Sequence, residues 1–314
     1  MLRRFSQLFI VVLTVVACEQ GDVPESPRGH DLARDYFSFA NTQQFVTDHL
    51  SLDLDVDFAA EALHGTATLS MRRVEPGAGE IILDTRDLSI AGVRFTSGSG
   101  ESIDADFRLG ERDAVTGTPL VIDVPRKLAD QQDLAMTIAY RTSPKSTALQ
   151  WLPPELTASG EHPFLFSQSQ AIHARSWIPL QDTPAVRITY DATIRTQPEL
   201  LAVMSANNDP AAQRDGTYEF DMPQPIPSYL LAIAVGNIYF APIGEQTGVY
   251  SEPEMLEASA FEFADTQAML ETAEAMFGPY QWGRYDLLIL PPSFPYGGME
   301  NPRLSFLTPS LLAG

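Results

Sequence analysis

Residues 287–314 read LLILPPSFPYGGMENPRLSFLTPSLLAG, and at their centre two glycines lead directly to a lone carboxylate, Glu300. Glycine has no Cβ, so Gly297 and Gly298 allow a ligand to approach the backbone closely and to meet its N–H groups. An ionised Glu only accepts hydrogen bonds, which suits it to an ammonium group. The pattern favours recognition of the free amino end of a peptide; a tight turn between two strands with a surface Glu is the alternative interpretation.

The segment GGMEN resembles the G-x-M-E-N exopeptidase motif of the M1 family of zinc aminopeptidases. Its flanks, and a second segment at residues 167–184, SQSQAIHARSWIPLQDTP, resemble the branch of that family that includes leukotriene A(4) hydrolase and aminopeptidase B. The resemblance extends from about residue 35 to the end of the chain. It implies a mainly β N-terminal domain of saddle-like, packed antiparallel sheets, followed by the truncated start of an α+β, thermolysin-like catalytic domain.

The resemblance also implies roles for individual residues. Glu300 anchors the α-amine of the substrate, and the backbone of Gly297 and Gly298 lies along the scissile bond. Without the resemblance, Gln170 would be an unremarkable strand residue; with it, its amide helps to position the amine or the peptide backbone. The remaining substrate-binding residues implied in this way are Ser169, Ala171, Tyr296, Met299 and Asn301.

The metal half of such a site is missing from the sequence. The family holds zinc through H-E-x-x-H on a helix and a later Glu, and the zinc-bound water supplies a hydroxide. No H-E-x-x-H occurs here, and none of the five histidines has a partner four residues on. His173 lies in the second family segment, but a lone His in a strand-rich region is typical of a structural residue. We expect zinc in a longer protein, its ligands beyond Gly314, and neither zinc nor hydrolysis in this chain alone.

Composition excludes some classes of function. The chain of 314 residues has a formal net charge of −21, a pI near 4.4 and 44% hydrophobic residues. This balance is typical of a folded protein with a substantial core and disfavours nucleic-acid binding, which requires a basic face. An acidic surface could attract cationic peptides, or could serve solubility alone.

The N-terminus has the features of an export signal. Arg3 and Arg4 precede an apolar run at residues 8–16 that is too short to span a bilayer, and VVAC at residues 15–18 resembles a bacterial lipobox. We therefore expect a lipoprotein signal peptide at 1–17, a lipid anchor on Cys18, the only cysteine, and a flexible tether at 18–35. The predicted location is the bacterial cell envelope, facing the periplasm or in the outer membrane. The alternative is an ordinary signal peptide with a chance cysteine.

Period-two alternation predicts an all-β domain over residues 36–240. The clearest predicted strands are at residues 50–58, 134–140 and 186–194, with shorter ones at 81–83 and 120–124. Residues 207–229 contain several prolines and are expected to form loops, and residues 230–240 one further strand.

A change of pattern near residue 241 predicts the start of a second domain, 241–314. One helix is expected over residues 251–277, with Ser251 and Glu254 as a capping box and Gly278 at its end. Its core-facing stripe would comprise Leu256, Phe263, Leu270, Ala273 and Phe277. A buried strand at residues 285–290 follows.

The leading functional hypothesis is the N-terminal portion of a monomeric, exported zinc aminopeptidase that acts on peptides with a free N-terminus. The resemblance also allows an epoxide hydrolase activity of the leukotriene A(4) type. A third hypothesis is a non-catalytic, peptide-binding envelope lipoprotein. A fourth is a purely structural β-sandwich module, which would leave both family segments without a role.

Overall fold

The computed structural model describes residues 35–292, 294 and 297–313. The predicted signal peptide, the predicted lipidation site Cys18 and the predicted pocket residue Tyr296 therefore lie outside the described residues. From Tyr36 onward the chain forms one folded unit, which is mainly β, as expected, and has two helices near its end.

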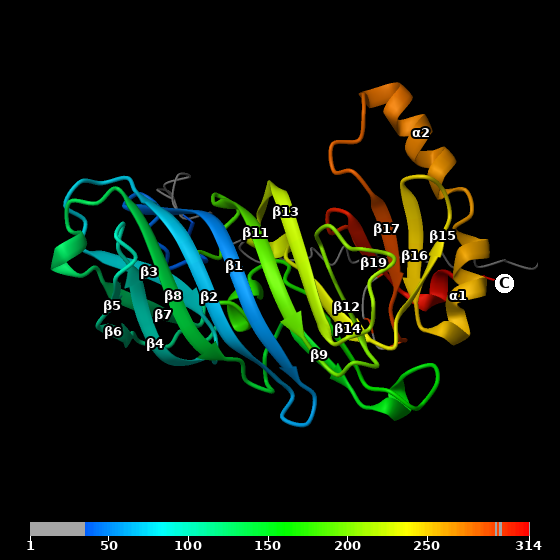
Figure 1. The fold of residues 1–314 in the computed structure, drawn as a ribbon, viewed down its shortest axis with the longest axis horizontal. Helices are drawn as coiled ribbons and strands as arrows, with labels where there is room; N and C mark the ends of the chain where they lie inside the picture. The colour runs from blue at the N-terminus through cyan, green and yellow to red at the C-terminus, as the bar shows by residue number, and fades with distance from the viewer. Residues whose placement is uncertain (1–34, 293, 295–296, 314) are drawn as a thin grey trace, which may run out of the picture. The chain divides into compact units, whose positions relative to one another are not determined.

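The largest sheet is built from the long alternating segments (Figure 1). In its strand β1, Leu50, Leu52 and Leu54 are buried, whereas Asp48 and Asp53 on the other face are exposed. Strand β1 pairs antiparallel with β2 and parallel with β11. In spatial order the strands are β13 (Thr217–Pro227), β11 (Arg187–Arg195), β1 (Phe45–Asp57), β2 (Ala62–Arg73), β8 (Asp133–Arg141), β4 (Ser89–Thr96) and β5 (Ser102–Asp104).

Residues 207–216 form a loop, as expected, but strand β13 corrects the expectation of loops from residue 217 onward. It pairs antiparallel with β11 at residues 217–222 and 226–227, and Pro223 and Pro225 lie at the irregularity between these two paired stretches. It lies at the edge of the sheet, where prolines do not interrupt a second ladder of hydrogen bonds. The prolines were therefore a signal of an edge strand and not of a loop.

Two smaller sheets complete the β region. The three-stranded sheet consists of β3 (Glu80–Thr85), β7 (Thr118–Asp123) and β6 (Phe107–Leu109). The four-stranded sheet consists of β12 (Leu201–Met204), β14 (Ile233–Gly236), β10 (Phe164–Ser167) and β9 (Leu149–Leu152), and all four residues of β10 are buried. Short 3-10 helices connect these elements and the chain end: η1 (Arg126–Leu128), η2 (Pro154–Leu156), η3 (Ala174–Ser176), η4 (Ser228–Leu230) and η5 (Pro309–Leu311).

The fourth sheet has five strands and begins inside the predicted strand at residues 230–240. That prediction was wrong in its extent, because β14 ends at Gly236 and the chain then enters a different sheet at Tyr239. The five strands are β15 (Tyr239–Pro242), β16 (Thr247–Ser251), β17 (Tyr285–Ile289), β19 (Leu304–Leu307) and β18 (Gly298–Met299).

Two helices replace the single helix expected at residues 251–277. They are α1 (Pro253–Glu262) and α2 (Thr266–Phe277), and Gly278 ends the second in a left-handed conformation, as expected. The predicted capping box does not form: Glu252 is the N-cap, and the Ser251 hydroxyl donates to the Glu252 carbonyl. The break also divides the predicted stripe, so that Leu270 is buried while Ala273 and Phe277 are exposed.

The five-stranded sheet has an apolar core on each face, as period-two alternation requires. On one face Val249, Leu287 and Ile289 pack against α1 and its neighbours. On the other face Leu288 and Leu290 join the main core, which extends through the sheets of the β region. The strand that leads to the Gly-Gly turn is thus fixed from both sides.

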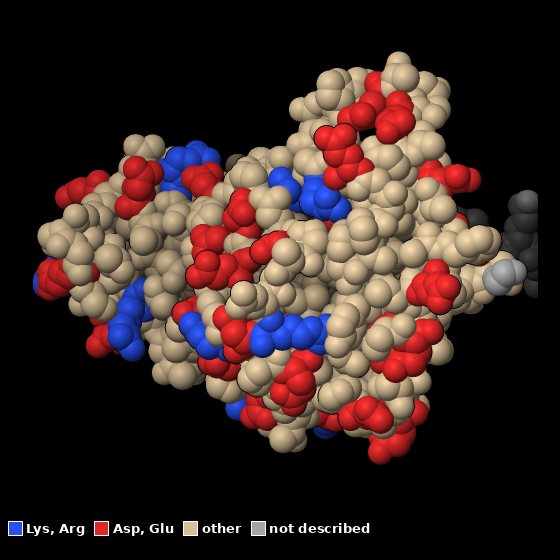
Figure 2. Space-filling view, turned by 45° about the vertical axis from the view of Figure 1, so that its right-hand side comes forward, with Lys and Arg blue, Asp and Glu red and all other residues tan. Residues whose placement is uncertain are grey.

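The surface is acidic, as the net charge predicts. On the face drawn in Figure 2, Asp and Glu side chains are spread widely, whereas Lys and Arg gather in its middle and left parts. Helices α1 and α2 contain no Lys or Arg. Among the residues that the structure describes, no helix has the length and apolar character needed to cross a bilayer.

Candidate functional site

The Gly-Gly turn is carried by the edge of the five-stranded sheet. Strand β17 runs parallel to β19, and the two-residue strand β18 returns antiparallel on the outer side of β19. The Thr308 N–H donates to the Gly297 carbonyl at 3.2 Å, and the Asn301 N–H donates to the Met299 carbonyl at 2.9 Å. Two backbone bonds therefore close the loop on both sides of the glycines.

The two glycines have different surroundings. A Cβ placed on Gly298 would lie 3.1 Å from Leu307 Cδ2 and 3.8 Å from an Oε atom of Glu300, so a side chain here would press on strand β19. A Cβ placed on Gly297 would meet nothing within 4 Å, and Gly297 is exposed. Gly298 therefore allows the turn to pack, while Gly297 leaves the backbone open to a ligand.

Glu300 is the exposed member of this turn. It lies between two buried residues, Met299 and Asn301, which are 6% and 3% exposed and hold the turn in the core. Within the described part of the chain no hydrogen bond or ion pair engages its carboxylate, and the Asn301 Nδ2 has no partner either. An unpaired carboxylate on a fixed turn, beside an open glycine backbone, is an arrangement that can bind an ammonium group.

The second family segment begins at the end of β10. Ser169 is buried; its hydroxyl donates to the Leu231 carbonyl at 2.7 Å and accepts from Trp177 Nε1 at 3.1 Å. Gln170 and Ala171 are exposed and joined by a cis peptide bond. The side-chain amide of Gln170 has no hydrogen bond among the described residues. Ser169 thus holds the segment, and Gln170 and Ala171 are the members open to a ligand.

Aromatic packing brings the two segments together. The ring of Phe166, at the end of β10, meets that of Phe294, in the loop before the glycines, edge to face at 5.6 Å between centroids. Met299 and Trp177 belong to the same core cluster. The resemblance implies that residues of both segments bind the same substrate, and in the structure the two segments share one core.

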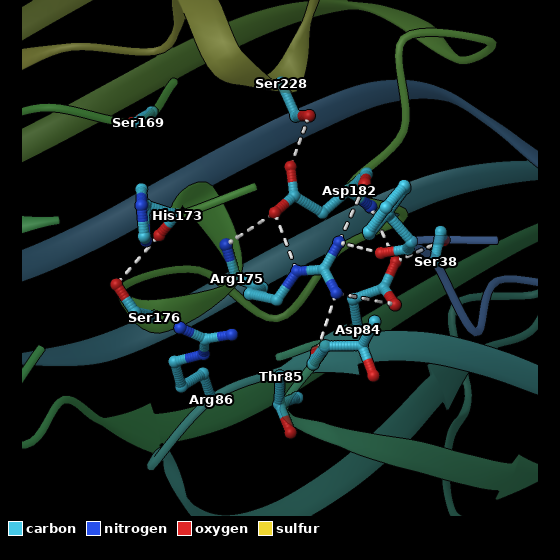
Figure 3. Close-up of polar contacts among 12 residues, drawn as sticks. Ser38, Asp84, Thr85, Arg86, Ser169, His173, Arg175, Ser176, Asp182 and Ser228 are labelled. Atoms are coloured by element: carbon cyan, nitrogen blue, oxygen red, sulfur yellow. Dashed lines mark hydrogen bonds and ion pairs between the residues drawn. The ribbon is translucent and has the colours of Figure 1, made fainter. Parts of the chain in front are cut away.

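A buried polar cluster around Arg175 supports the second segment, and sequence reasoning did not identify it (Figure 3). Arg175 is fully buried, and its Nε donates to Asp182 at 2.9 Å while its Nη1 lies 3.5 Å from Asp84. Its other guanidinium hydrogens reach the carbonyls of Thr116, Phe37 and Asp182. A charged residue within the apolar stretch ARSWIPL was the only sequence signal for this cluster.

The two carboxylates of this Arg175 cluster are also bonded on their far sides. Asp84 accepts from the Ser38 hydroxyl at 2.6 Å and from the Phe39 and Asp182 N–H groups at 2.7 and 2.9 Å. Burial raises the pKa of Asp84 to about 6, although Arg175 and these donors favour its charged form. A buried charge is tolerated only with such pairing, so the Arg175 cluster is a structural device that fixes residues 175–182.

The described residues do not fit a zinc site. Within them no group of three or more His, Cys, Asp or Glu side chains is arranged to hold a metal ion. His173, the histidine in the family segment, bonds through Nδ1 to the Thr147 hydroxyl at 2.8 Å, and burial lowers its pKa. This environment suits a structural residue.

A surface depression of about 460 Å³ lies elsewhere, over β12, β13 and the loop between them. Leu201, Asn208 and Glu219 are among the residues that line it, and none of the predicted site residues does. The candidate site is therefore the Glu300 turn and not this depression.

Comparison with known proteins decides the family. Residues 46–230 match the Peptidase M1 N-terminal domain, and residues 261–314 match the Peptidase family M1 domain. The chain belongs to the M1 peptidase family. The matched ranges lie on either side of the domain boundary predicted near residue 241, which remains a prediction.

Individual relatives place the chain in a branch of this family. It is 48% identical to the leukotriene A-4 hydrolase of Xenopus laevis over 282 residues and 42% identical to leucine aminopeptidase 2 of Yarrowia lipolytica over 285. The native yeast LTA4 hydrolase structure superposes with a TM-score of 0.81 at 36% identity, covering 89% of this chain and 43% of that one. The first two matches include 88% and 90% of this chain. The chain spans only 46% and 42% of the length of those two relatives.

Proposed function

We propose that this chain is the N-terminal portion of a zinc-dependent aminopeptidase that removes N-terminal residues from peptides. Glu300 anchors the α-amine of the substrate, the backbone of Gly297 and Gly298 lies along the scissile bond, and Gln170 and Ala171 border the substrate from the β domain. The observation that carries the proposal is the exposed carboxylate of Glu300, unpaired among the described residues and held beside the open backbone of Gly297.

In this proposal zinc belongs to the longer protein and supplies the metal chemistry from ligands beyond residue 314, so the chain alone is inactive. Membership of the M1 family supports this, together with the absence of a fitting metal cluster among the described residues. An exposed apolar surface on the helices gives further support. Phe261, Met269, Met276 and Phe277 are 66–83% exposed, and we propose that the rest of an M1 domain covers them.

The test is kinetic and uses the protein extended past residue 314 by the remainder of its M1 domain. We expect wild type to hydrolyse a short peptide with a free α-amine and not its N-acetylated counterpart. Glu300→Gln should lower kcat/KM for the free-amine peptide by roughly 10- to 100-fold, because a hydrogen bond between two charged groups becomes one to a neutral amide. Equal kcat/KM for Glu300→Gln and wild type would overturn the assignment.

A control separates loss of the amine anchor from misfolding. Glu300 is exposed, with no partner among the described residues, so Glu300→Gln should leave the thermal unfolding midpoint of the extended protein unchanged. A non-catalytic binding lipoprotein would give no hydrolysis with Glu300→Gln or with wild type. A structural β module would, in addition, show no binding of the free-amine peptide.

A second candidate activity is hydrolysis of an epoxide of the leukotriene A(4) type. The relative that is 48% identical is named leukotriene A-4 hydrolase, which favours this candidate activity. An ammonium anchor has no role with a substrate that lacks an amine, so Glu300→Gln should affect the two activities unequally. Comparing the loss on the free-amine peptide with the loss on the epoxide tests this.

The proposal includes export and lipid anchoring at Cys18 in a bacterial cell envelope, supported by the basic residues, the short apolar run and the lipobox-like VVAC. Cys18→Ser should abolish incorporation of labelled fatty acid and release the protein from the membrane fraction. Membrane-associated, labelled Cys18→Ser protein would contradict it.

A further inference from the structure

Arg303 is a buried arginine three residues after Glu300. It is 6% exposed, and its backbone is left-handed, with φ 67°. Its carbonyl accepts from the Asp286 N–H at 2.9 Å, and the Leu304 N–H donates to the Asn301 carbonyl at 3.3 Å. The backbone of the Glu300 turn therefore ends at Arg303, tied to strand β17.

The guanidinium of Arg303 reaches out of this sheet to the β region. Its Nη1 donates to the Asn207 side-chain oxygen, and its Nη2 donates to that of Gln224 at 2.9 Å. Asn207 precedes β13, and Gln224 lies on β13. A Cβ on Gly283 would lie 3.4 Å from Nη1, so the group is also packed against the loop before β17.

Each acceptor is itself oriented by a further bond. The Asn207 amide donates to both oxygens of Asp221, at 2.9 and 3.0 Å, and its backbone N–H donates to the Asp221 carbonyl. The Gln224 amide donates to the Gln281 carbonyl at 2.8 Å. These bonds turn both amide oxygens toward Arg303, so the guanidinium meets two acceptors in a fixed geometry.

The direct partners of this charge are neutral amides, while burial lowers the pKa of Arg303 and its Nε has no partner among the described residues. An apolar side chain of similar length would be buried at a lower desolvation cost. The hydrogen bonds of Arg303 therefore matter more for the position of the Glu300 turn than for stability. They fix this turn at one position against β13.

We propose that Arg303 is a positioning residue for amine binding. It holds the Glu300 turn in register with the β region, where Gln170 lies, through Asn207 and Gln224. This inference rests on the proposed function, because it concerns the same amine-binding carboxylate.

The test compares Arg303→Met with Arg73→Met in the extended protein. Arg73 is a matched control: it is 7% exposed, its Nε also lacks a partner among the described residues, and its guanidinium bonds to the Leu128 and Ala129 carbonyls, away from the turn. We expect Arg303→Met to raise KM for the free-amine peptide about tenfold with kcat within twofold, because amine binding is lost equally from ground and transition states. Arg73→Met should lower the unfolding midpoint without changing KM.

Two further variants test whether the hydrogen-bond geometry of Arg303 positions the Glu300 turn. Arg303→Lys retains charge without the two-pronged geometry and should raise KM by an intermediate factor. Asn207→Ala should raise KM on its own and add little to Arg303→Met, because both variants remove the same hydrogen bond between Arg303 and Asn207. An unchanged KM in Arg303→Met, with a lower unfolding midpoint, would overturn the positioning role. Failure of the proposed function is distinct, because Glu300→Gln would then share the kinetics of wild type.

Discussion

Arg175, in the short helix η3, and Glu300, directly after strand β18, are both charged, yet only Arg175 finds its partners within the described chain. Arg175 is fully buried between two carboxylates and three backbone carbonyls, and each carboxylate is bonded on its far side as well. Glu300 is exposed beside an open glycine backbone, without a hydrogen bond or ion pair among the described residues.

The difference in burial and pairing separates a charge that stabilises the fold from a charge that can bind a ligand. A buried charge must be satisfied inside the protein, so the Arg175 cluster can only hold the chain. An exposed charge without a partner among the described residues can meet a ligand of opposite sign. The two segments that carry them meet where Phe166 contacts Phe294, so a rigid element and an open one share one core.

The largest expected effect is on the supporting side. Arg175→Met leaves Asp84 and Asp182 buried without their cation, so we expect it to lower the free energy of unfolding by about 3–5 kcal/mol. Arg195→Met, which removes a surface partner of Asp53, should cost about 0–1 kcal/mol. Urea unfolding measures both. Equal losses would remove the distinction between the buried cluster and a surface ion pair.

The next effect is a pH dependence that originates at Asp84. Its pKa in the folded protein, about 6, lies above the ordinary value of 3.8 because of burial, so the folded state binds this proton more tightly than the unfolded state. The contribution of Asp84 to the free energy of unfolding should therefore be complete below pH 4 and fall by up to about 3 kcal/mol as pH rises through 6.

Asp84→Asn removes this dependence, so the difference in unfolding free energy between wild type and Asp84→Asn should change between pH 4 and pH 7. The control is Asp53, whose pKa is lowered by its hydrogen bond to Arg195. The contribution of Asp53 has the opposite sign and is lost as pH falls. A wild-type-to-Asp84→Asn difference that is constant with pH would contradict the account.

The smallest effect distinguishes the two glycines of the Glu300 turn. Gly298→Ala places a Cβ 3.1 Å from Leu307 Cδ2 and should lower the free energy of unfolding by about 1 kcal/mol. Gly297→Ala meets no neighbour and should cost less than about 0.5 kcal/mol. Differential scanning calorimetry resolves the two variants; a larger cost for Gly297→Ala would reverse the assignment of which glycine packs and which faces a ligand.

The sequence predicted those parts of the fold that depend on local pattern. Alternation located β1, β8 and β11, and Gly278 marked the end of the last helix. It failed where sheet position overrides local preference. The prolines of β13 indicated a loop because an edge strand cannot be recognised without its neighbours, and the break between α1 and α2 has no proline or glycine to announce it.

The candidate site divides in the same way. The Gly-Gly turn and Glu300 are contiguous, so a motif could reveal them. The Arg175 cluster joins Asp84 to Asp182, 98 residues apart, and Arg303 reaches Asn207 across 96 residues. Contacts at such separations leave no local pattern, and only the fold brings their atoms together.

We propose that this chain carries the amine-binding half of an aminopeptidase site without the metal half. The most direct measurement is the zinc content of the purified 314-residue chain, together with hydrolysis of a free-amine peptide by the same sample. We expect zinc well below one ion per chain and no hydrolysis, with both appearing once the chain is extended by the rest of its M1 domain. One zinc ion per chain, with hydrolysis that a chelator abolishes, would contradict it.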